Sequence, residues 1–137
     1  LCGNQPDMIR RALDIGVQCI ILCQTDVDPA WLENAGKTCV IVDDLIDTAG
    51  TLCNAAAALV EKGRAKKVIA CATHGVLSGP AIDRLESSNI EELALLDTIP
   101  AHPEAVRARI KYLSVASMFS EAIERTYQEV SISKLFR

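Results

Sequence analysis

The stretch Val-Ile-Val-Asp-Asp-Leu-Ile-Asp-Thr-Ala-Gly-Thr, residues 40–51, joins a branched apolar run to two carboxylates and a small, hydroxyl-rich turn. The apolar character of residues 37–42 predicts a buried strand. Residues 52–62 are rich in alanine and leucine and are followed by Gly63, which predicts a helix with a glycine at its end. A buried strand that passes through a short polar loop into a helix is typical of α/β proteins.

Strand and helix patterns alternate along the rest of the 137 residues. The other expected strands are residues 18–23, 67–72, 92–96 and 111–115, and the other expected helices are residues 7–15, 80–86 and 117–127. Strands of this kind, apolar on both faces, predict a mainly parallel sheet of about five strands that is covered on each side by helices. We expect a single domain over residues 1–137, with its ligands at the carboxyl ends of the strands.

Composition excludes several classes of function. Charged residues make up 23% of the chain and the formal net charge is −4, which argues against a nucleic-acid or anionic-membrane surface. No apolar run approaches the length of a membrane span. The six cysteines form no Cys-x-x-Cys pair and follow no signal segment, so we expect small core residues in a cytoplasmic protein rather than a redox or metal role. The sequence opens on Leu1, which favours a fragment of a longer chain.

The two adjacent carboxylates, Asp43 and Asp44, follow the expected strand directly. Paired carboxylates can accept hydrogen bonds from both hydroxyls of a vicinal diol, and they can share a divalent cation with the sugar oxygens. The alternative is a pair of solvated turn acids, with Asp47 or Thr48 capping the helix that follows.

The second half of the stretch offers the opposite chemistry. Backbone N–H groups at the start of a helix favour an anion, threonine hydroxyls add donors, and small residues let the backbone approach a phosphate closely. A diol at one end and a phosphate at the other describe ribose 5-phosphate. The expected ligands of ribose 5-phosphate are Asp43, Asp44, Asp47, Thr48, Ala49, Gly50 and Thr51.

These twelve residues resemble the phosphoribosyl pyrophosphate binding motif of the phosphoribosyltransferase fold. Later segments look like the corresponding stretches of one family with that fold, the ribose-phosphate pyrophosphokinases. The segments are Thr-His-Gly-Val-Leu-Ser-Gly-Pro-Ala at 73–81, Asp-Thr-Ile-Pro at 97–100, Ser-Glu-Ala-Ile-Glu-Arg-Thr at 120–126 and Ser-Ile-Ser-Lys-Leu-Phe at 131–136. The resemblance runs in order from about residue 37 to residue 136, and places the chain in the C-terminal half of a two-domain protein.

The resemblance implies a reaction: transfer of the β,γ-diphosphoryl group of ATP to ribose 5-phosphate, giving phosphoribosyl pyrophosphate and AMP, with Mg²⁺ as cofactor. Asp43 and Asp44 would hold the ribose hydroxyls and, through the sugar, the Mg²⁺ ion. His74 would support the ligand edge of the sheet, although a turn histidine is the equal alternative. Family members usually form homo-oligomers, commonly hexamers, and the ATP base is held largely outside this sequence.

The tail resembles the part of regulated family members that lines an effector site between subunits, with Ser131, Ser133 and Phe136 in the matching positions. A docked and otherwise inert C-terminus is the alternative. In the helix before it, Met118, Phe119, Ala122 and Ile123 recur at helical spacing, which predicts a face packed into the core.

One segment departs from the family. Residues 24–35 are acidic, whereas family members carry a loop rich in lysine and arginine there that stabilises charge on the ATP phosphates. We therefore assign no catalytic residue and expect no activity from these 137 residues alone. Two hypotheses follow: a part of the enzyme, or a non-catalytic regulatory subunit of it. A free-standing phosphoribosyltransferase is a weaker third reading.

Overall fold

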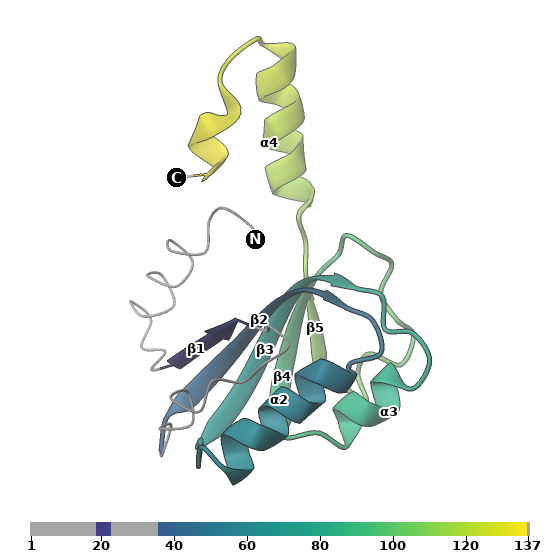
Figure 1. The fold of residues 1–137 in the computed structure, drawn as a ribbon. Helices are drawn as coiled ribbons and strands as arrows, with labels where there is room; N and C mark the ends of the chain where they lie inside the picture. The colour runs from purple at the N-terminus through teal and green to yellow at the C-terminus, as the bar shows by residue number, and fades with distance from the viewer. Residues whose placement is uncertain (1–18, 23–35, 137) are drawn as a thin grey trace.

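The structure, a computed structural model, describes residues 19–22 and 36–136 and has an α/β fold (Figure 1). The strands of this part are β1 (Cys19–Leu22), β2 (Thr38–Ile46), β3 (Lys67–Gly75), β4 (Ile90–Leu96) and β5 (Ile110–Leu113). Its helices are α2 (Gly50–Glu61), α3 (Ala81–Glu86), α4 (Ala116–Tyr127) and a short 3₁₀ helix, η2 (Ile132–Phe136). The expected helix at residues 7–15 lies outside the described residues.

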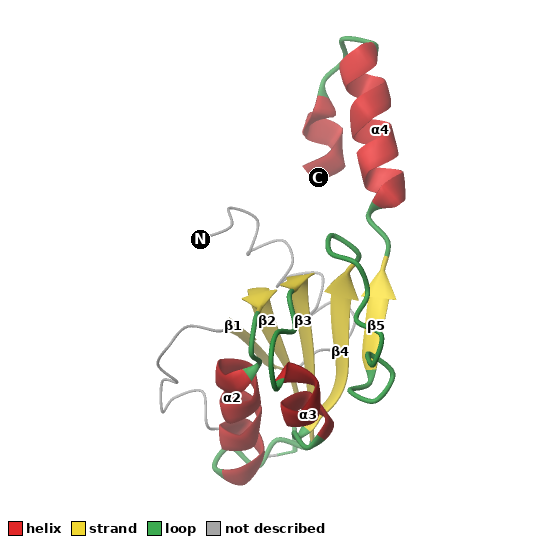
Figure 2. Cartoon of the chain, turned by 90° about the vertical axis from the view of Figure 1, so that its right-hand side faces the viewer, coloured by secondary structure: helices red, strands yellow, loops and turns green. Residues whose placement is uncertain are grey.

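The strands form one parallel sheet whose spatial order, β1-β2-β3-β4-β5, is also their order along the chain. Crossovers between parallel strands are almost always right-handed, so successive crossovers in one direction place their helices on one face of the sheet. α2 and α3 both lie on that face (Figure 2). The predicted parallel sheet of about five strands is confirmed. Helical cover on the second face is not seen within the described residues.

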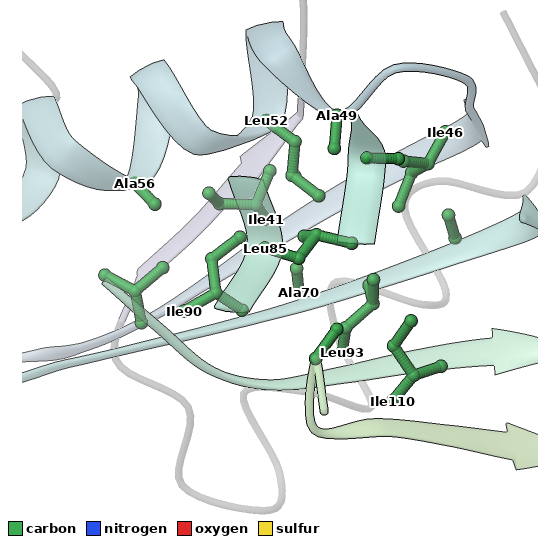
Figure 3. Packing of buried hydrophobic residues seen from close by; sticks show 14 of the residues in the cluster. Ile41, Ile46, Ala49, Leu52, Ala56, Ala70, Leu85, Ile90, Leu93 and Ile110 are labelled. Carbon is green, nitrogen blue, oxygen red and sulfur yellow. The ribbon is translucent and has the colours of Figure 1, made fainter. Parts of the chain in front are cut away.

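The apolar residues of the sheet, α2 and α3 meet in one core (Figure 3). The first part of β3 alternates, with Val68, Ala70 and Ala72 buried toward the helices and the residues between them half-buried. α2 buries residues spaced three or four apart, which is the period of one helix face. The largest fully buried side chains are Ile41, Leu52, Leu59, Leu85, Leu93, Leu95 and Val68.

β2 and β3 extend further than their apolar runs predict. Their parallel register continues past Val42, pairing Asp43 with Ala72, and then through to Ile46 and Gly75. The ladder is made by backbone groups, so it can continue through polar residues as long as the neighbouring strand is present. Asp43 therefore lies inside β2, and the expectation that it follows the strand end is wrong.

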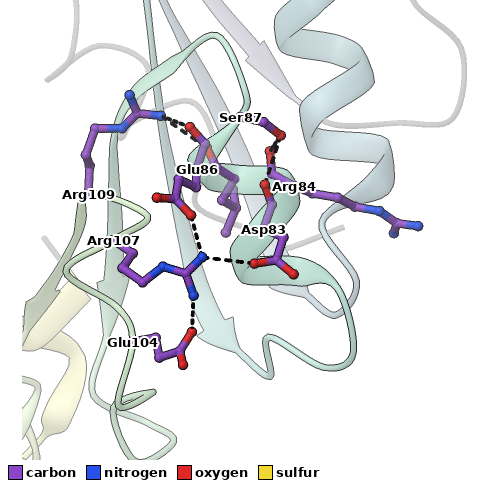
Figure 4. A network of polar contacts seen from close by, with 8 residues as sticks. Asp83, Arg84, Glu86, Ser87, Glu104, Arg107 and Arg109 are labelled. Atoms are coloured by element: carbon purple, nitrogen blue, oxygen red, sulfur yellow. Dashed lines mark hydrogen bonds and ion pairs between the residues drawn. The ribbon is translucent and has the colours of Figure 1, made fainter.

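Ion pairs tie α3 to the connection between β4 and β5. Arg107 donates to Asp83 at 3.1 Å and to Glu86 at 2.6 Å, and it also pairs with Glu104 (Figure 4). Arg109 donates to backbone carbonyls at the end of α3. Exposed ion pairs each contribute only about 0–1 kcal/mol, so this network orients α3 more than it stabilises the domain.

α4 contradicts the expected core packing of its apolar stripe. The helix projects from the end of β5 and stands away from the sheet together with η2 (Figure 1). None of its residues is buried, and Met118, Phe119 and Ile123 are 44%, 54% and 68% exposed. Periodicity predicted the apolar face correctly, but it cannot tell which surface that face meets.

No helix in the described part of the chain is long and apolar enough to cross a lipid bilayer.

Replacing Leu93 with alanine is expected to lower the free energy of unfolding by about 2–5 kcal/mol, because the side chain is fully buried in β4 and its loss leaves a cavity. Val106→Ala is the matched control, since this side chain is 88% exposed and its truncation should cost less than about 0.5 kcal/mol. Urea unfolding of both variants measures the difference. Equal losses would show that the core is not where the sheet and helices meet.

Candidate functional site

The carboxyl ends of β2, β3, β4 and β5 form one edge of the sheet, and residues 43–51 lie on it. The Asp43 carboxylate is half-buried and accepts a hydrogen bond from the Asp44 N–H at 2.9 Å, while Asp44 is exposed. Neighbouring side chains of an extended strand leave the backbone on opposite sides. The two carboxylates are thus adjacent in the chain, but the strand directs them differently. Carboxylate oxygens are ligands that Mg²⁺ prefers, so either acid could supply one ligand, with the others coming from a sugar or from water.

The start of α2 carries no side-chain cap. Its N-cap residue is Ala49, which has a left-handed backbone with φ of 59°, and no side chain bonds the helix there. The first turn also holds no acidic residue. The alternative in which Asp47 or Thr48 merely caps the helix is therefore wrong. The N–H groups of this turn keep their tendency to attract an anion.

Asp47 instead bonds the turn that follows β3. The hydroxyl of Ser78 donates to the Asp47 carboxylate, and the Ser78 N–H donates to the Asp47 carbonyl at 3.0 Å. The N–H groups of Val76 and Leu77 both donate to the Ile46 carbonyl. These bonds join the end of β3 to the loop after β2. Asp47 is thus an anchor of the loop, although its other carboxylate oxygen can still face a ligand.

Arg84 holds the other side of the loop. Its Nη1 donates to the carbonyl of Thr48 at 2.9 Å and lies close enough to Gly50 that a Cβ there would be 3.4 Å away. The space behind it is a hollow of about 390 Å³ between α2 and α3, lined in part by Cys53 and Ser88. Sequence reasoning missed both Ser78 and Arg84 as supports of the loop. Ser78 lay in the family-like segment 73–81, and no local pattern marked Arg84.

His74 is half-buried at the end of β3, opposite Leu45 of β2 in the register of the sheet. Its Nδ1 lies 2.8 Å from the hydroxyl oxygen of Thr98. That hydroxyl has one proton, and it donates this proton to the Thr73 carbonyl at 2.9 Å. Nδ1 must therefore donate to Thr98, which fixes the orientation of the imidazole ring and directs Nε2 away from Thr98. The histidine lies in β3 and is oriented by Thr98, which follows β4, so it is not a free turn residue.

Asp97 joins the end of β4 to the start of α4. Hydrogen bonds from Ser114 and then from the Val115 N–H, the latter at 2.8 Å, lower the pKa of its carboxyl group because both donors favour the ionised form. The Asp97 N–H also donates to the Leu113 carbonyl at 3.1 Å. The carboxylate thus fixes the point where α4 leaves the sheet.

The structure does not bring the tail to the 43–51 segment. The hydroxyl oxygens of Ser131 and Ser133 lie 3.0 Å apart, and both residues are exposed beside α4. Phe136 ends η2. The acidic segment 24–35 lies outside the described residues.

Cys53 and Cys71 form no disulfide, and burial raises the pKa values of both thiols. A raised pKa keeps a thiol protonated, which agrees with the expected structural role. Within residues 19–22 and 36–136, no three or more histidine, cysteine, aspartate and glutamate side chains gather as metal ligands.

Comparison with known proteins places these features in a family. Residues 31–137 match the family described as phosphoribosyl synthetase-associated domain. Over 102 residues, or 74% of this chain, the sequence is 55% identical to a ribose-phosphate pyrophosphokinase of Clostridium acetobutylicum, and over 100 residues, or 73%, it is 57% identical to one of Clostridium tetani. These matches span only 32% and 31% of the two relatives' lengths.

A solved structure is also similar. The crystal structure of phosphoribosylpyrophosphate synthetase from Mycobacterium smegmatis superimposes with a TM-score of 0.67 and 38% sequence identity. The similar part covers 71% of this chain and 32% of that one.

Ser78→Ala is expected to reduce the free energy of unfolding by about 1–2 kcal/mol, because the variant loses a hydrogen bond to the charged Asp47 carboxylate. Urea unfolding measures the loss, and amide exchange at Ser78 should become faster. Ser87→Ala is the control, since its hydroxyl donates only to carbonyls of its own helix turn. A loss no larger than that of the control would contradict an anchoring role for Ser78.

Asp97 predicts a dependence of stability on pH. Because folding lowers the pKa of this carboxyl, its ionised form stabilises the fold above its ordinary value of about 4, and this contribution disappears as the pH falls through the lowered value. The wild type should therefore be more stable than Asp97→Asn at about pH 6, and the two should converge as the pH falls toward about 2. Urea unfolding across this range is the measurement, and a difference that does not change with pH would contradict it.

Proposed function

Because this chain belongs to the phosphoribosyl synthetase-associated domain family, we propose that it is the ribose-5-phosphate-binding part of a ribose-phosphate pyrophosphokinase. We place it in the C-terminal half of that enzyme because its tail resembles the family's ending. The chain spans about a third of the length of its curated relatives, so the complete activity belongs to a longer polypeptide.

One observation carries the proposal: the uncapped start of α2 adjoins the carboxylate-bearing end of β2. The first-turn N–H groups, with the hydroxyls of Thr48 and Thr51, would bind the 5-phosphate. The carboxylates of Asp43 and Asp44 would accept hydrogen bonds from the ribose hydroxyls. A ligand with an anion at one end and a diol at the other satisfies both groups of residues.

In the proposed transfer of diphosphate from ATP to ribose 5-phosphate, the protein mainly positions the reactants and neutralises charge. The chain would hold the sugar at both ends, so that the anomeric hydroxyl faces the polyphosphate of ATP. Asp43 and Asp44 would hold Mg²⁺ together with sugar oxygens, and the ion would neutralise charge on the transferred group. His74 would present its Nε2 at the same edge of the sheet, with the ring held in place by Thr98.

The exposed stripe of α4 supports a larger assembly. Apolar side chains such as Phe119 and Ile123 are more than half exposed in this chain, and a contiguous apolar face of this kind marks a contact surface. We propose that the remaining two thirds of the polypeptide supply the ATP site and that complete chains form a homo-oligomer. Ser131, Ser133 and Phe136 would then line an effector site between subunits.

A non-catalytic regulatory subunit is the second candidate. The acidic sequence of residues 24–35 favours it, because carboxylates beside ATP would repel the phosphates that a basic loop stabilises. Such a subunit would bind ribose 5-phosphate and assemble with an active partner without turning over.

The proposal is tested with the complete polypeptide that carries this chain, by coupled detection of AMP formed from ATP and ribose 5-phosphate. The double variant Asp43→Ala/Asp44→Ala is expected to bind ribose 5-phosphate about 100-fold more weakly or worse, because hydrogen bonds to charged groups contribute roughly 1.5–3 kcal/mol each. Calorimetry with ribose 5-phosphate measures binding separately from turnover.

Glu91→Ala/Glu92→Ala is the matched control. It also removes two neighbouring carboxylates, but at the start of β4, where each forms an exposed ion pair with a lysine. This variant should bind and react as the wild type does. A wild type that binds ribose 5-phosphate but forms no AMP would favour the regulatory subunit, and a wild type that does not bind the sugar phosphate would refute both candidates.

A further inference from the structure

Arg84 differs from the other arginines around α3. Arg107 and Arg109 bind carboxylates and carbonyls between α3 and the chain before β5, whereas the Arg84 side chain points away from that network (Figure 4). Its Nη1 donates to the Thr48 carbonyl at 2.9 Å, across 36 positions of sequence. The end of α3 thus reaches the loop that precedes α2.

This hydrogen bond fixes the orientation of one peptide unit. In a planar trans peptide, the C=O and the following N–H point in opposite directions. Because the Thr48 carbonyl points toward Arg84, the Ala49 N–H points to the other side of the loop. No backbone carbonyl of the described residues accepts a hydrogen bond from this N–H.

The orientation is one that alanine does not favour. Ala49 has φ of 59°, and a residue with a Cβ pays a steric penalty in that left-handed region. Turning over the Thr48–Ala49 peptide would carry φ of Ala49 toward the negative values that alanine prefers, and it would also turn the N–H toward Arg84. Two contacts oppose that flip: the Arg84 hydrogen bond, and the Ala49 side chain, which is only 5% exposed.

We propose that Arg84 is a positioning residue that holds the Thr48–Ala49 peptide so that the Ala49 N–H faces the phosphate of the bound sugar phosphate. This inference rests on the proposed function of the 43–51 segment. Arg84 does not touch the ligand in this arrangement. A Cβ at Gly50 would make only ordinary contacts, 3.4 Å from Nη1 and 3.9 Å from the Thr48 hydroxyl oxygen, so the approach of Arg84 does not depend on this glycine.

The test compares Arg84→Gln and Arg84→Lys with the wild type in the complete polypeptide, using ribose 5-phosphate and, separately, inorganic phosphate in calorimetry. Arg84→Gln should weaken the binding of both ligands about tenfold. This is the expected cost when one backbone N–H no longer donates to a charged acceptor. Arg84→Lys should recover part of the loss, because an ammonium group can reach the carbonyl but lacks the planar fork of donors. In turnover, KM for ribose 5-phosphate should rise while KM for ATP stays unchanged.

Arg64→Gln is the control for charge. It removes one positive charge from an exposed residue just beyond α2, at the far end of the helix from the loop. Equal weakening by Arg64→Gln and Arg84→Gln would assign the effect to general electrostatics and overturn the positioning role. Wild-type affinity in Arg84→Gln would overturn it as well.

Two further outcomes are distinguishable. If circular dichroism and thermal unfolding show that Arg84→Gln does not fold, Arg84→Lys decides the question. Wild-type phosphate affinity of Arg84→Lys with an unchanged KM for ribose 5-phosphate would overturn the positioning role. An intermediate loss of affinity would support it. If the wild type itself binds no ribose 5-phosphate, the proposed function fails, whereas loss of the Arg84 effect alone leaves that function standing.

Discussion

The parallel pairing of β2 with β3 is the constraint on which the site depends. It continues to Ile46 and Gly75, beyond the apolar part of either strand, and so delivers both chain segments to the same edge of the sheet. Backbone hydrogen bonds from Val76 and Leu77 to Ile46 then carry the pairing into the turns that follow. Without this extended ladder, the loop before α2 would have no fixed neighbour, and neither Asp47 nor His74 would have its present surroundings.

Much of the fold followed from short-range patterns, and the errors have definite causes. Apolar runs located every described strand, because a strand buried in a parallel sheet must be apolar. They ended β2 too early, because the aspartates are paired through their backbones and their side chains carry no signal of this. The stripe of α4 was read as core because periodicity reports that a face is apolar and says nothing of its partner.

The candidate site was predictable only in part, because short-range patterns show the residues of one stretch and not the distant residues that support it. The sequence of residues 43–51 contains the groups expected to bind the ligand, in one continuous stretch with a family resemblance. The groups that hold this stretch in shape come from 31 and 36 positions away, through Ser78 and Arg84. A serine and a surface arginine have no distinguishing pattern, so only the folded arrangement identifies them. The left-handed conformation of Ala49 could not be predicted from the sequence either, because alanine rarely adopts that conformation.

The uncapped start of α2 has a consequence for how the domain behaves without its ligand. No side chain satisfies the first-turn N–H groups of α2, and in the proposed site a bound anion would satisfy them instead. Binding of the anion would then stabilise the ordered helix start, and an ordered helix start would bind the anion more tightly. With the proposed sugar phosphate bound, the first turn of α2 would be more ordered than without it, so its local order would follow the concentration of that ligand.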